Sequence, residues 1–312
     1  MPLARLNLVR FSLQITPMFR KLIDLGIVGL LVLIFVSLFG RYFPPGDSIA
    51  VFRIPLVLIL ISIIWMAPKF VKFLGLVVIL ITLFVDGLHR YGNGYDPNIK
   101  ASYRLYQKNV SYRVKDTGPL VADIIHSNAS FVTLQEVSFS QEAFLQQLST
   151  IYPHQHHCPF YKELGGPTIL SRLPFIENSL ICLRGLAAAK VQASDGELWI
   201  ISLHLYWPWP HDQSKQIDQL EPFLSSLDAP VILAGDFNAV PWSGTLQRVK
   251  QILGTKRVGP VKSTFADLPL IPMGLTIDHI LASSRNHRLE LRPNLGSDHK
   301  GLLADIDPAG AS

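Results

Sequence analysis

The chain lacks any charge excess outside its first 87 residues. Residues 1–87 hold eight basic and three acidic residues, which accounts for the whole net charge of +5, and the rest holds 20 of each sign. A protein that grips a nucleic-acid polymer by its phosphates needs a basic surface. The balance after residue 87 therefore argues against a processive nuclease, although the pI of about 9.2 taken alone would favour a polyanionic partner.

Cysteine is also scarce, and the chain has no internal repeat or low-complexity tract. Its two cysteines, Cys158 and Cys182, lie 24 residues apart. A disulfide formed in an oxidising compartment and two buried free thiols are both open at this point, because the sequence does not give the Cα separation that decides between them.

Long apolar runs are missing after residue 87 but dominate the region before it. Leu22 to Phe39 contains a single charged residue, Asp24. At 1.5 Å per residue this run is about 27 Å long, enough to cross a bilayer core with help from its flanks. No small-x-small cleavage site follows it, so we expect a retained membrane anchor and not a signal peptide.

Two further apolar segments follow the first. Together they predict about three transmembrane helices, at about residues 22–40, 50–67 and 70–87. Re-entrant or buried soluble helices are the alternative for the second and third segments. Arg53 and Lys72 lie near segment ends, where we expect them to reach the lipid headgroups.

The charges around these segments predict the topology. Four basic residues precede the first segment, namely Arg5, Arg10, Arg20 and Lys21. By the positive-inside rule the N-terminus is then cytoplasmic, and one or three crossings leave the remainder of the chain outside. We therefore expect an integral protein of a bacterial inner membrane with its large domain periplasmic or extracellular. The bilayer is the one macroscopic partner that follows, and no protein partner can be inferred.

The chain divides into an anchor at 1–87, a turn-rich linker at 88–102 and a large domain at 103–312. Within the large domain, short apolar strands interleave with amphipathic helices expected at 118–128, 141–151 and 211–224. Many of the connections are too short for crossover helices. They favour two packed mixed sheets with helices outside over a doubly wound fold.

The most informative stretch is Gly235-Asp236-Phe237-Asn238-Ala239, which directly follows an apolar run at 230–234. A buried strand that ends in a carboxylate and an amide can hold a water and bind a phosphoryl oxygen. A simple Asp/Asn turn is the alternative, because both residues favour turns for local reasons.

Other apolar runs end in polar residues of the same kind. Along the chain these are Asn109, Glu136 within Gln135-Glu136, His204, Asp278 within Ile277-Asp278-His279, and Asp298 and His299 within Ser297-Asp298-His299. Singly, each is more simply a solvated strand end or a buried core residue. Together with the 235–239 stretch they make six such segments, and their occurrence in this one order is much more specific than any one of them.

In this order the residues resemble the endonuclease/exonuclease/phosphatase superfamily over roughly Tyr103 to Ile306. The resemblance implies an α/β (α+β) domain of deoxyribonuclease-I-like fold, with two packed mixed β-sheets flanked by helices in a four-layer sandwich. Here the domain is preceded by transmembrane helices. It also implies cleavage of phosphoester bonds with a divalent metal.

The resemblance assigns the metal to Glu136, with Asn109 beside it and Asp298 as a further ligand or orienting group. Oxygen ligands of this kind suit Mg²⁺ or Mn²⁺ and not zinc. Family members often carry a second Asn shortly after the first, where this chain has Ser111 to Val114.

The same resemblance assigns the catalytic groups. Asp236 would activate the attacking water and Asn238 would hold that water or a phosphoryl oxygen. His299 would contact the phosphate, with Asp278 hydrogen-bonded to its far nitrogen. His204 would donate a second hydrogen bond to the phosphate or the leaving group.

Two other features of the sequence invite a functional reading. Tyr206-Trp207-Pro208-Trp209-Pro210 follows His204, so Trp207 and Trp209 are candidate substrate contacts, although a packed loop or a wedge into the bilayer interface would carry the same residues. His154, His156 and His157 suggest a metal cluster, but no fourth ligand accompanies them and a surface strand is favoured.

The sequence thus predicts a membrane-anchored, divalent-metal-dependent phosphoesterase that acts by attack of water on a lipid, small-molecule or nucleic-acid phosphoester. An endonuclease or exonuclease is the first alternative. A non-catalytic membrane scaffold that retains the fold is the second, and a lost ligand would be its sign.

Overall fold

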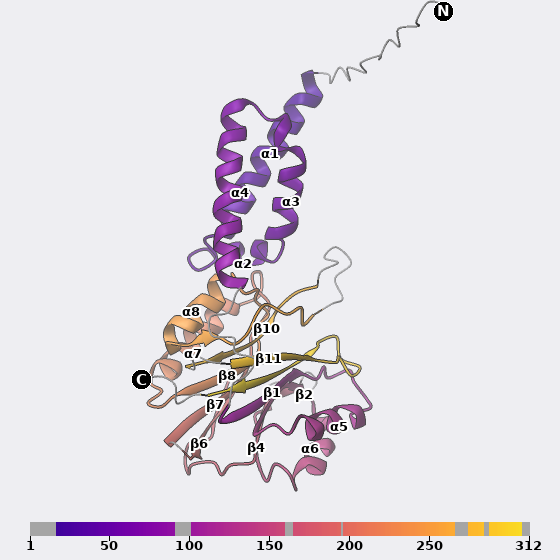
Figure 1. Cartoon of the computed structure of the whole chain (residues 1–312), viewed down its shortest axis with the longest axis vertical. Coiled ribbons are helices and arrows are strands. Elements are labelled where there is room, and N and C mark those ends of the chain that lie inside the picture. Colours follow the sequence, from indigo (N-terminus) through magenta and orange to yellow (C-terminus); the bar gives the residue numbers. More distant parts are fainter. Residues whose placement is uncertain are drawn as a thin grey trace, which may run out of the picture.

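The structure of the chain is a computed structural model that describes residues 17–90, 101–159, 165–194, 196–265, 274–283 and 287–307. Residues 17–90 form a helical bundle at one end of the molecule, and the residues from 101 onward form an α/β domain at the other (Figure 1). Most of the predicted linker, at 91–100, lies outside the described residues.

Three long helices of the bundle lie side by side, and a short one lies against the α/β domain (Figure 1). Their bounds are α1 Pro17–Ser37, α2 Pro44–Ala50, α3 Arg53–Ile63 with the 3₁₀ turn η1 Ile64–Met66, and α4 Lys69–Arg90. The direction of the chain changes by 68° between α2 and the α3–η1 pair.

By length and composition, the stretch Lys69–His89 of α4 can cross a membrane, and the bent pair of α2 with α3–η1 can do so if it counts as one span. The first predicted segment falls in α1, which begins at Pro17 and ends at Ser37. Arg20, Lys21 and Asp24 lie within its 21 residues, and α1 is not among the helices that are long and apolar enough to cross a membrane.

Arg53 does not point to lipid headgroups as the sequence suggested. Its side chain is buried, and its Nη1 lies 2.6 Å from Asp86 Oδ1 on α4. Its Nε donates to Ser37 Oγ at 2.8 Å. The guanidinium therefore joins the ends of α1, α3 and α4. A charged side chain buried in a bundle needs polar partners, because the surrounding apolar residues cannot offer any.

Two six-stranded sheets form the α/β domain. The first has the order β11-β12-β1-β2-β4-β3, with bounds β11 His287–Arg292, β12 Gly301–Ile306, β1 Tyr103–Asn109, β2 Phe131–Val137, β4 Gly166–Ser171 and β3 His154–His157. The second has the order β5-β6-β7-β8-β10-β9, with bounds β5 Ile181–Leu183, β6 Leu186–Ala193, β7 Gly196–His204, β8 Val231–Asp236, β10 Asp278–Ala282 and β9 Lys256–Arg257.

Both sheets are mixed, because β1–β2 and β7–β8 are parallel pairs among antiparallel neighbours. A buried apolar core that includes Leu105, Ile200 and Ile232 lies between the sheets. The outer faces are covered by helices, which are α5 Gly118–Ser127 and α6 Ala143–Leu148 on the first sheet and α7 Gln213–Ser225 and α8 Gly244–Leu253 on the second. The predicted four-layer arrangement of two mixed sheets flanked by helices is confirmed (Figure 1).

Cys158 and Cys182 form a disulfide with their Cα atoms 5.5 Å apart, which resolves the alternative that the sequence left open. The three histidines of β3 do not form a metal cluster. His156 Nε2 lies 3.0 Å from Ile181 O beside the disulfide, and His157 Nδ1 lies 2.7 Å from Thr168 Oγ1. They belong to the surface strand that the sequence favoured.

Candidate active site

Strand register in the second sheet brings three of the predicted site residues into one row. His204 at the end of β7 pairs with Asp236 at the end of the parallel strand β8. Asp236 in turn pairs with Asp278 at the start of the antiparallel strand β10. Because directly paired residues on neighbouring strands lie only about 5 Å apart, this register brings the two carboxylates and the imidazole together.

The first sheet contributes Asn109 and Glu136 from its own parallel pair. Asn109 at the end of β1 is in register with Gln135 of β2, and Glu136 follows directly. Glu136 has a φ of 59°, and the register with β4 shifts between Leu134 and Val137. A bulge of this kind redirects a side chain from the regular alternation of a strand. Here Gln135 remains between the sheets, and Glu136 lines the pocket described below.

Asn109 connects the two sheets at the site. Its Nδ2 donates at 3.0 Å to Glu136 Oε1 and at 3.0 Å to Asp236 Oδ2. Its Oδ1 accepts from Ser111 N at 3.0 Å. In this orientation the amide nitrogen holds two carboxylates close together while the amide oxygen contacts the backbone.

His204 lies between the same two carboxylates. Its Nε2 is 3.7 Å from Glu136 Oε1 and 3.7 Å from Asp236 Oδ2. Burial raises the pKa of Asp236 to about 6, with Asp278 contributing in the same direction and the nearby histidines opposing it. A carboxyl group with this pKa can accept a proton near neutral pH.

Asp278 and His299 form a buried pair with His299 Nδ1 2.8 Å from Asp278 Oδ2. Burial alone would lower the pKa of His299, but Asp278 and then Asp236 outweigh it and raise the pKa to about 10. Burial opposes ionisation of Asp278 too, yet His299 and the hydrogen bonds to Asp278 hold the pKa of this carboxyl below its usual value. The pair is thus an imidazolium held by a carboxylate at neutral pH.

Asn238 occupies the turn after β8 with a φ of 47°. Its backbone N donates to Asp236 Oδ1 at 2.9 Å, and its Nδ2 donates to Leu205 O at 2.8 Å. With the amide nitrogen so engaged, the amide oxygen is the side-chain atom of Asn238 that can accept a hydrogen bond from a water.

One pocket of about 390 Å³ is lined by five of these residues, namely Glu136, His204, Asp236, Asn238 and His299. Asp298 lines it as well, and its Oδ1 accepts from Ser297 Oγ at 3.4 Å. Trp207 forms part of the rim and is 39% exposed. Trp209 is 56% exposed and lines a neighbouring pocket, so the structure separates the two candidate aromatic contacts.

The donor set fits a hard divalent cation. Glu136, Asp236 and Asp298 present carboxylate oxygens to the same pocket, and oxygen ligands are those that Mg²⁺ and Mn²⁺ prefer. Ligand atoms of Asp236, Asp278 and His299 also lie within 4.8 Å of one another. Within that second group, His299 Nδ1 and Asp278 Oδ2 are already paired with each other at 2.8 Å.

Several contributors to the pocket were missed by sequence reasoning. Tyr112 N donates to Glu136 Oε2 at 3.3 Å, in the segment where family members often have a second Asn. Phe265 packs between Trp207 and His299, with ring centroids 6.2 Å and 4.9 Å away. Gln107 Nε2 donates to Asp278 Oδ1 at 2.9 Å from within β1. The backbone N of Tyr112 and the mid-strand amide of Gln107 leave no pattern in the sequence from which their roles could have been predicted.

Comparisons with known proteins agree with this fold. The model of the Endonuclease/Exonuclease/phosphatase family matches residues 106–299. The solved structure of an endonuclease/exonuclease/phosphatase from Beutenbergia cavernae DSM 12333 is similar with a TM-score of 0.51 and 20% identity, over 66% of this chain and 72% of that one. The D. rerio TDP2 structure complexed with single strand DNA product has a TM-score of 0.52 and 18% identity, over 65% of this chain and 97% of that one. At such identities these structures show the fold alone. No curated protein matches the chain.

Proposed function

The chain belongs to the Endonuclease/Exonuclease/phosphatase family, and from this premise we propose that it is a membrane-anchored, divalent-metal-dependent phosphoesterase. One observation carries the proposal. The row of His204, Asp236 and Asp278 on one sheet meets Asn109 and Glu136 on the other, so the residues expected for metal-assisted hydrolysis converge.

In the proposed reaction, Glu136 and neighbouring oxygen ligands hold the cation, with Asp298 and Asn109 as further candidates. The bound cation supplies charge neutralisation at the phosphoryl oxygens. Tyr112 N and Asn109 Nδ2 fix the two Glu136 oxygens by hydrogen bonds. This fixed orientation supports a role for Glu136 as the main ligand.

The remaining residues move or stabilise charge. Asp236, with its pKa of about 6, accepts a proton from the attacking water, and the Asn238 amide oxygen orients that water. His299 is held as a cation by Asp278 and stabilises charge that develops on the phosphoryl group. His204 donates a hydrogen bond to the leaving oxygen.

Arrangement of the bundle supports a membrane anchor with cytoplasmic N-terminus. Arg20 Nη2 donates to Met66 O at 3.2 Å, so the start of α1 and the end of η1 lie together, away from the α/β domain (Figure 1). This end carries Lys21, Lys69 and Lys72, as the positive-inside rule expects of the cytoplasmic side. At the opposite end Arg53 is paired with Asp86, so its charge contributes little to the charge balance that the positive-inside rule compares.

The Cys158–Cys182 disulfide supports placing the α/β domain outside the cytoplasm. Disulfides persist in the periplasm and on cell surfaces and are rare in the cytosol. An oxidising compartment and the helix topology thus favour the same location.

We propose a substrate of one or two phosphates at the membrane surface. The α/β domain with its linker has no net charge, and two aromatic residues in mutual contact, Trp207 and Phe265, line the pocket. A nuclease that grips several phosphates would need a basic groove and would lose affinity steeply with salt.

Hydrolysis by the purified full chain tests the proposal. A panel of phospholipids, sugar phosphates, single-stranded and duplex DNA is offered with Mg²⁺, and each substrate is repeated with the Asp236→Asn variant and with excess chelator. We expect release of a phosphoryl product from a lipid or small phosphoester that both controls abolish. Preferred cleavage of DNA would favour a nuclease, and no cleavage of any substrate would favour the scaffold alternative.

A further inference from the structure

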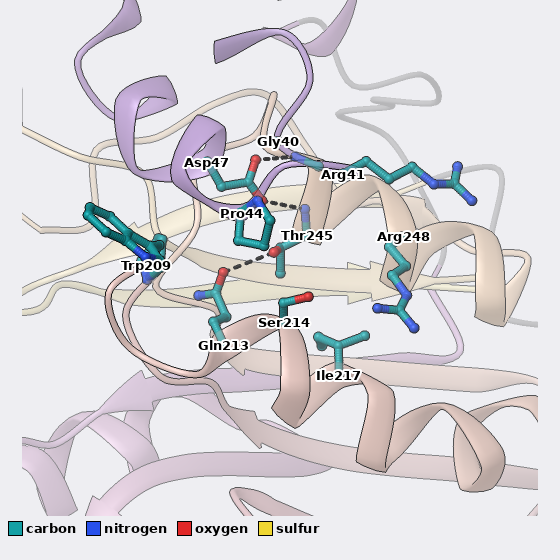
Figure 2. A pocket seen from close by; sticks show the side chains of 12 residues that line it. Gly40, Arg41, Pro44, Asp47, Trp209, Gln213, Ser214, Ile217, Thr245 and Arg248 are labelled. Atoms are coloured by element: carbon teal, nitrogen blue, oxygen red, sulfur yellow. Dashed lines mark hydrogen bonds between the residues drawn. The ribbon is translucent and has the colours of Figure 1, made fainter. Parts of the chain in front are cut away.

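The connection between α1 and α3 docks on the α/β domain at the start of α8 (Figure 2). Asp47 of α2 is 4% exposed, and its two carboxylate oxygens accept from Gly244 N at 2.7 Å and Thr245 N at 2.8 Å. These N–H groups belong to the first turn of α8, where the helix itself offers no acceptor. A carboxylate there also interacts favourably with the helix dipole.

Two glycines make this approach possible. A Cβ atom on Gly244 would lie 2.1 Å from Arg41 N, and a Cβ atom on Gly40 would lie 1.7 Å from Asp47 Oδ1. A larger residue at Gly244 would have to push the backbone at Gly40 and Arg41 away from α8, and a larger residue at Gly40 would displace the Asp47 carboxylate from its position. The glycines at these two positions thus allow α2 to pack closely against the start of α8.

From α8 the hydrogen bonds continue to the pocket. Thr245 Oγ1 donates to Gln213 Oε1 at 2.9 Å (Figure 2). That bond fixes the amide of Gln213 so that its Nε2 donates to Phe237 O at 3.0 Å, to Asn238 O at 3.4 Å and also to Tyr206 O. Gln213 is 2% exposed, so water offers it no alternative partners.

A second contact joins α2 to the aromatic loop, which we define as Tyr206–Pro210. Ser48 Oγ donates to the backbone oxygen of Trp209. Tyr206 and Trp207 line the catalytic pocket, whereas Pro208 and Trp209 line the small pocket beside α2. One loop therefore touches the bundle on one side and the site on the other.

We propose that α2 is a positioning element of the active site, in which Asp47 acts through Thr245 and Gln213 to hold Asn238 and the aromatic loop in the geometry of the reaction. The inference rests on the proposed phosphoesterase function. It makes the membrane helices part of the catalytic apparatus, so that a change in how the bundle is seated alters turnover.

Two substitutions interrupt the proposed connection at different points. Asp47→Asn keeps the shape but turns one acceptor into a donor facing an N–H group. Thr245→Val removes the hydroxyl that reaches Gln213 and leaves Thr245 N intact. Ser243→Ala is the matched control, because Ser243 Oγ caps the same helix at Leu246 N (3.1 Å) without contacting Gln213.

The full chain in detergent or lipid nanodiscs is assayed with Mg²⁺ and bis(p-nitrophenyl) phosphate. We expect Asp47→Asn and Thr245→Val each to lower kcat about ten- to a hundredfold with KM within about twofold, since small misplacements of catalytic groups have effects of this size. The double variant should be no slower than the slower single variant, because both break one connection. Ser243→Ala should keep kcat within about twofold of the parent.

Hydrogen exchange of the same four variants, followed by mass spectrometry, provides a readout that needs no activity. Segments 204–213 and 236–240 should exchange faster in Asp47→Asn and Thr245→Val and remain unchanged in Ser243→Ala. Parental kcat and exchange in Thr245→Val, or equal losses in Ser243→Ala, would overturn the inference while leaving the phosphoesterase proposal intact. A parent chain without hydrolysis would instead refute that function, and the exchange data would still decide whether α2 positions the two segments.

Discussion

The helical bundle and the α/β domain distribute their side chains in opposite ways. On the bundle, large apolar residues face outward, with Phe70 76% exposed and Phe84 67% exposed, while the ion pair of Arg53 and Asp86 is buried. In the α/β domain, apolar residues fill the space between and behind the sheets. Its buried polar residues include Asn109, Asp236, Asp278 and His299, which meet at the candidate site.

This difference supports the proposal that the bundle is a membrane anchor. An apolar outer surface of this extent would promote aggregation in water and is stable in a bilayer. The buried polar groups also have different purposes in the two regions. In the bundle, the ion pair of Arg53 and Asp86 joins three helices. In the domain, burial and neighbouring charges raise the pKa values of Asp236 and His299, as is common at functional sites.

The largest expected effect lies in the domain, at the proposed metal ligand. Glu136→Gln keeps the size of the side chain and removes its charge, so we expect turnover to fall about 10²-fold or more while thermal stability changes little. Steady-state hydrolysis with titrated Mg²⁺ measures the effect. Glu142→Gln, a more exposed carboxylate a short distance along the chain, serves as the control and should keep parental activity.

The next largest expected effect is a loss of stability in the bundle. Arg53→Met leaves the buried Asp86 carboxylate without its guanidinium, and removal of one partner of a buried pair costs about 3–5 kcal/mol in unfolding free energy. Reversible unfolding in mixed micelles measures this loss. The double variant Arg53→Met/Asp86→Leu should recover most of it, and a failure to recover would mean that other contacts of these two residues dominate.

A third change tests how the domain uses its buried pair. Asp278→Asn removes the anion that raises the pKa of His299, so we expect kcat to fall about ten- to a hundredfold. The imidazolium of the parent is present below pH 10 and is lost as the pH rises through about 10. Without the anion its pKa falls, and the alkaline limb of the pH–rate profile should move to lower pH. An unmoved limb with full kcat would assign Asp278 a structural role.

The smallest expected effect concerns the aromatic loop, where the two regions meet. Trp207→Ala should raise KM about two- to tenfold for a lipid phosphoester and less for a small soluble diester, because the lost packing lies beside the phosphate site. Trp209→Ala should have the smaller effect, because Trp209 lines the neighbouring pocket. Phe139→Ala, at an aromatic residue that is 81% exposed and does not line the pocket, provides the control. Salt should weaken binding by the equivalent of about one or two counterions. A steep salt dependence on duplex DNA, with no response to either tryptophan change, would contradict the small-substrate proposal.

The order of polar residues at strand ends, through the family that it resembles, was enough to predict the fold and the residues of the candidate site. Asn109, Glu136, His204, Asp236, Asn238, Asp278, Asp298 and His299 were all named from the sequence, and the structure brings them to the lining or the wall of one pocket. The resemblance carried this prediction, and the geometry is consistent with it, because strand ends in a mixed sheet meet at common edges.

Only the tertiary structure decided the features that depend on contacts between distant segments. The bulge at Glu136 requires the register with β4, the pairing of Arg53 with Asp86 requires the helices to pack, and the seat of Asp47 requires residues nearly 200 positions away. The disulfide likewise depended on a Cα separation of 5.5 Å. Sequence patterns report the period and the ends of an element, which are local, whereas these features follow from how the elements pack, because packing sets the partners of each buried polar group.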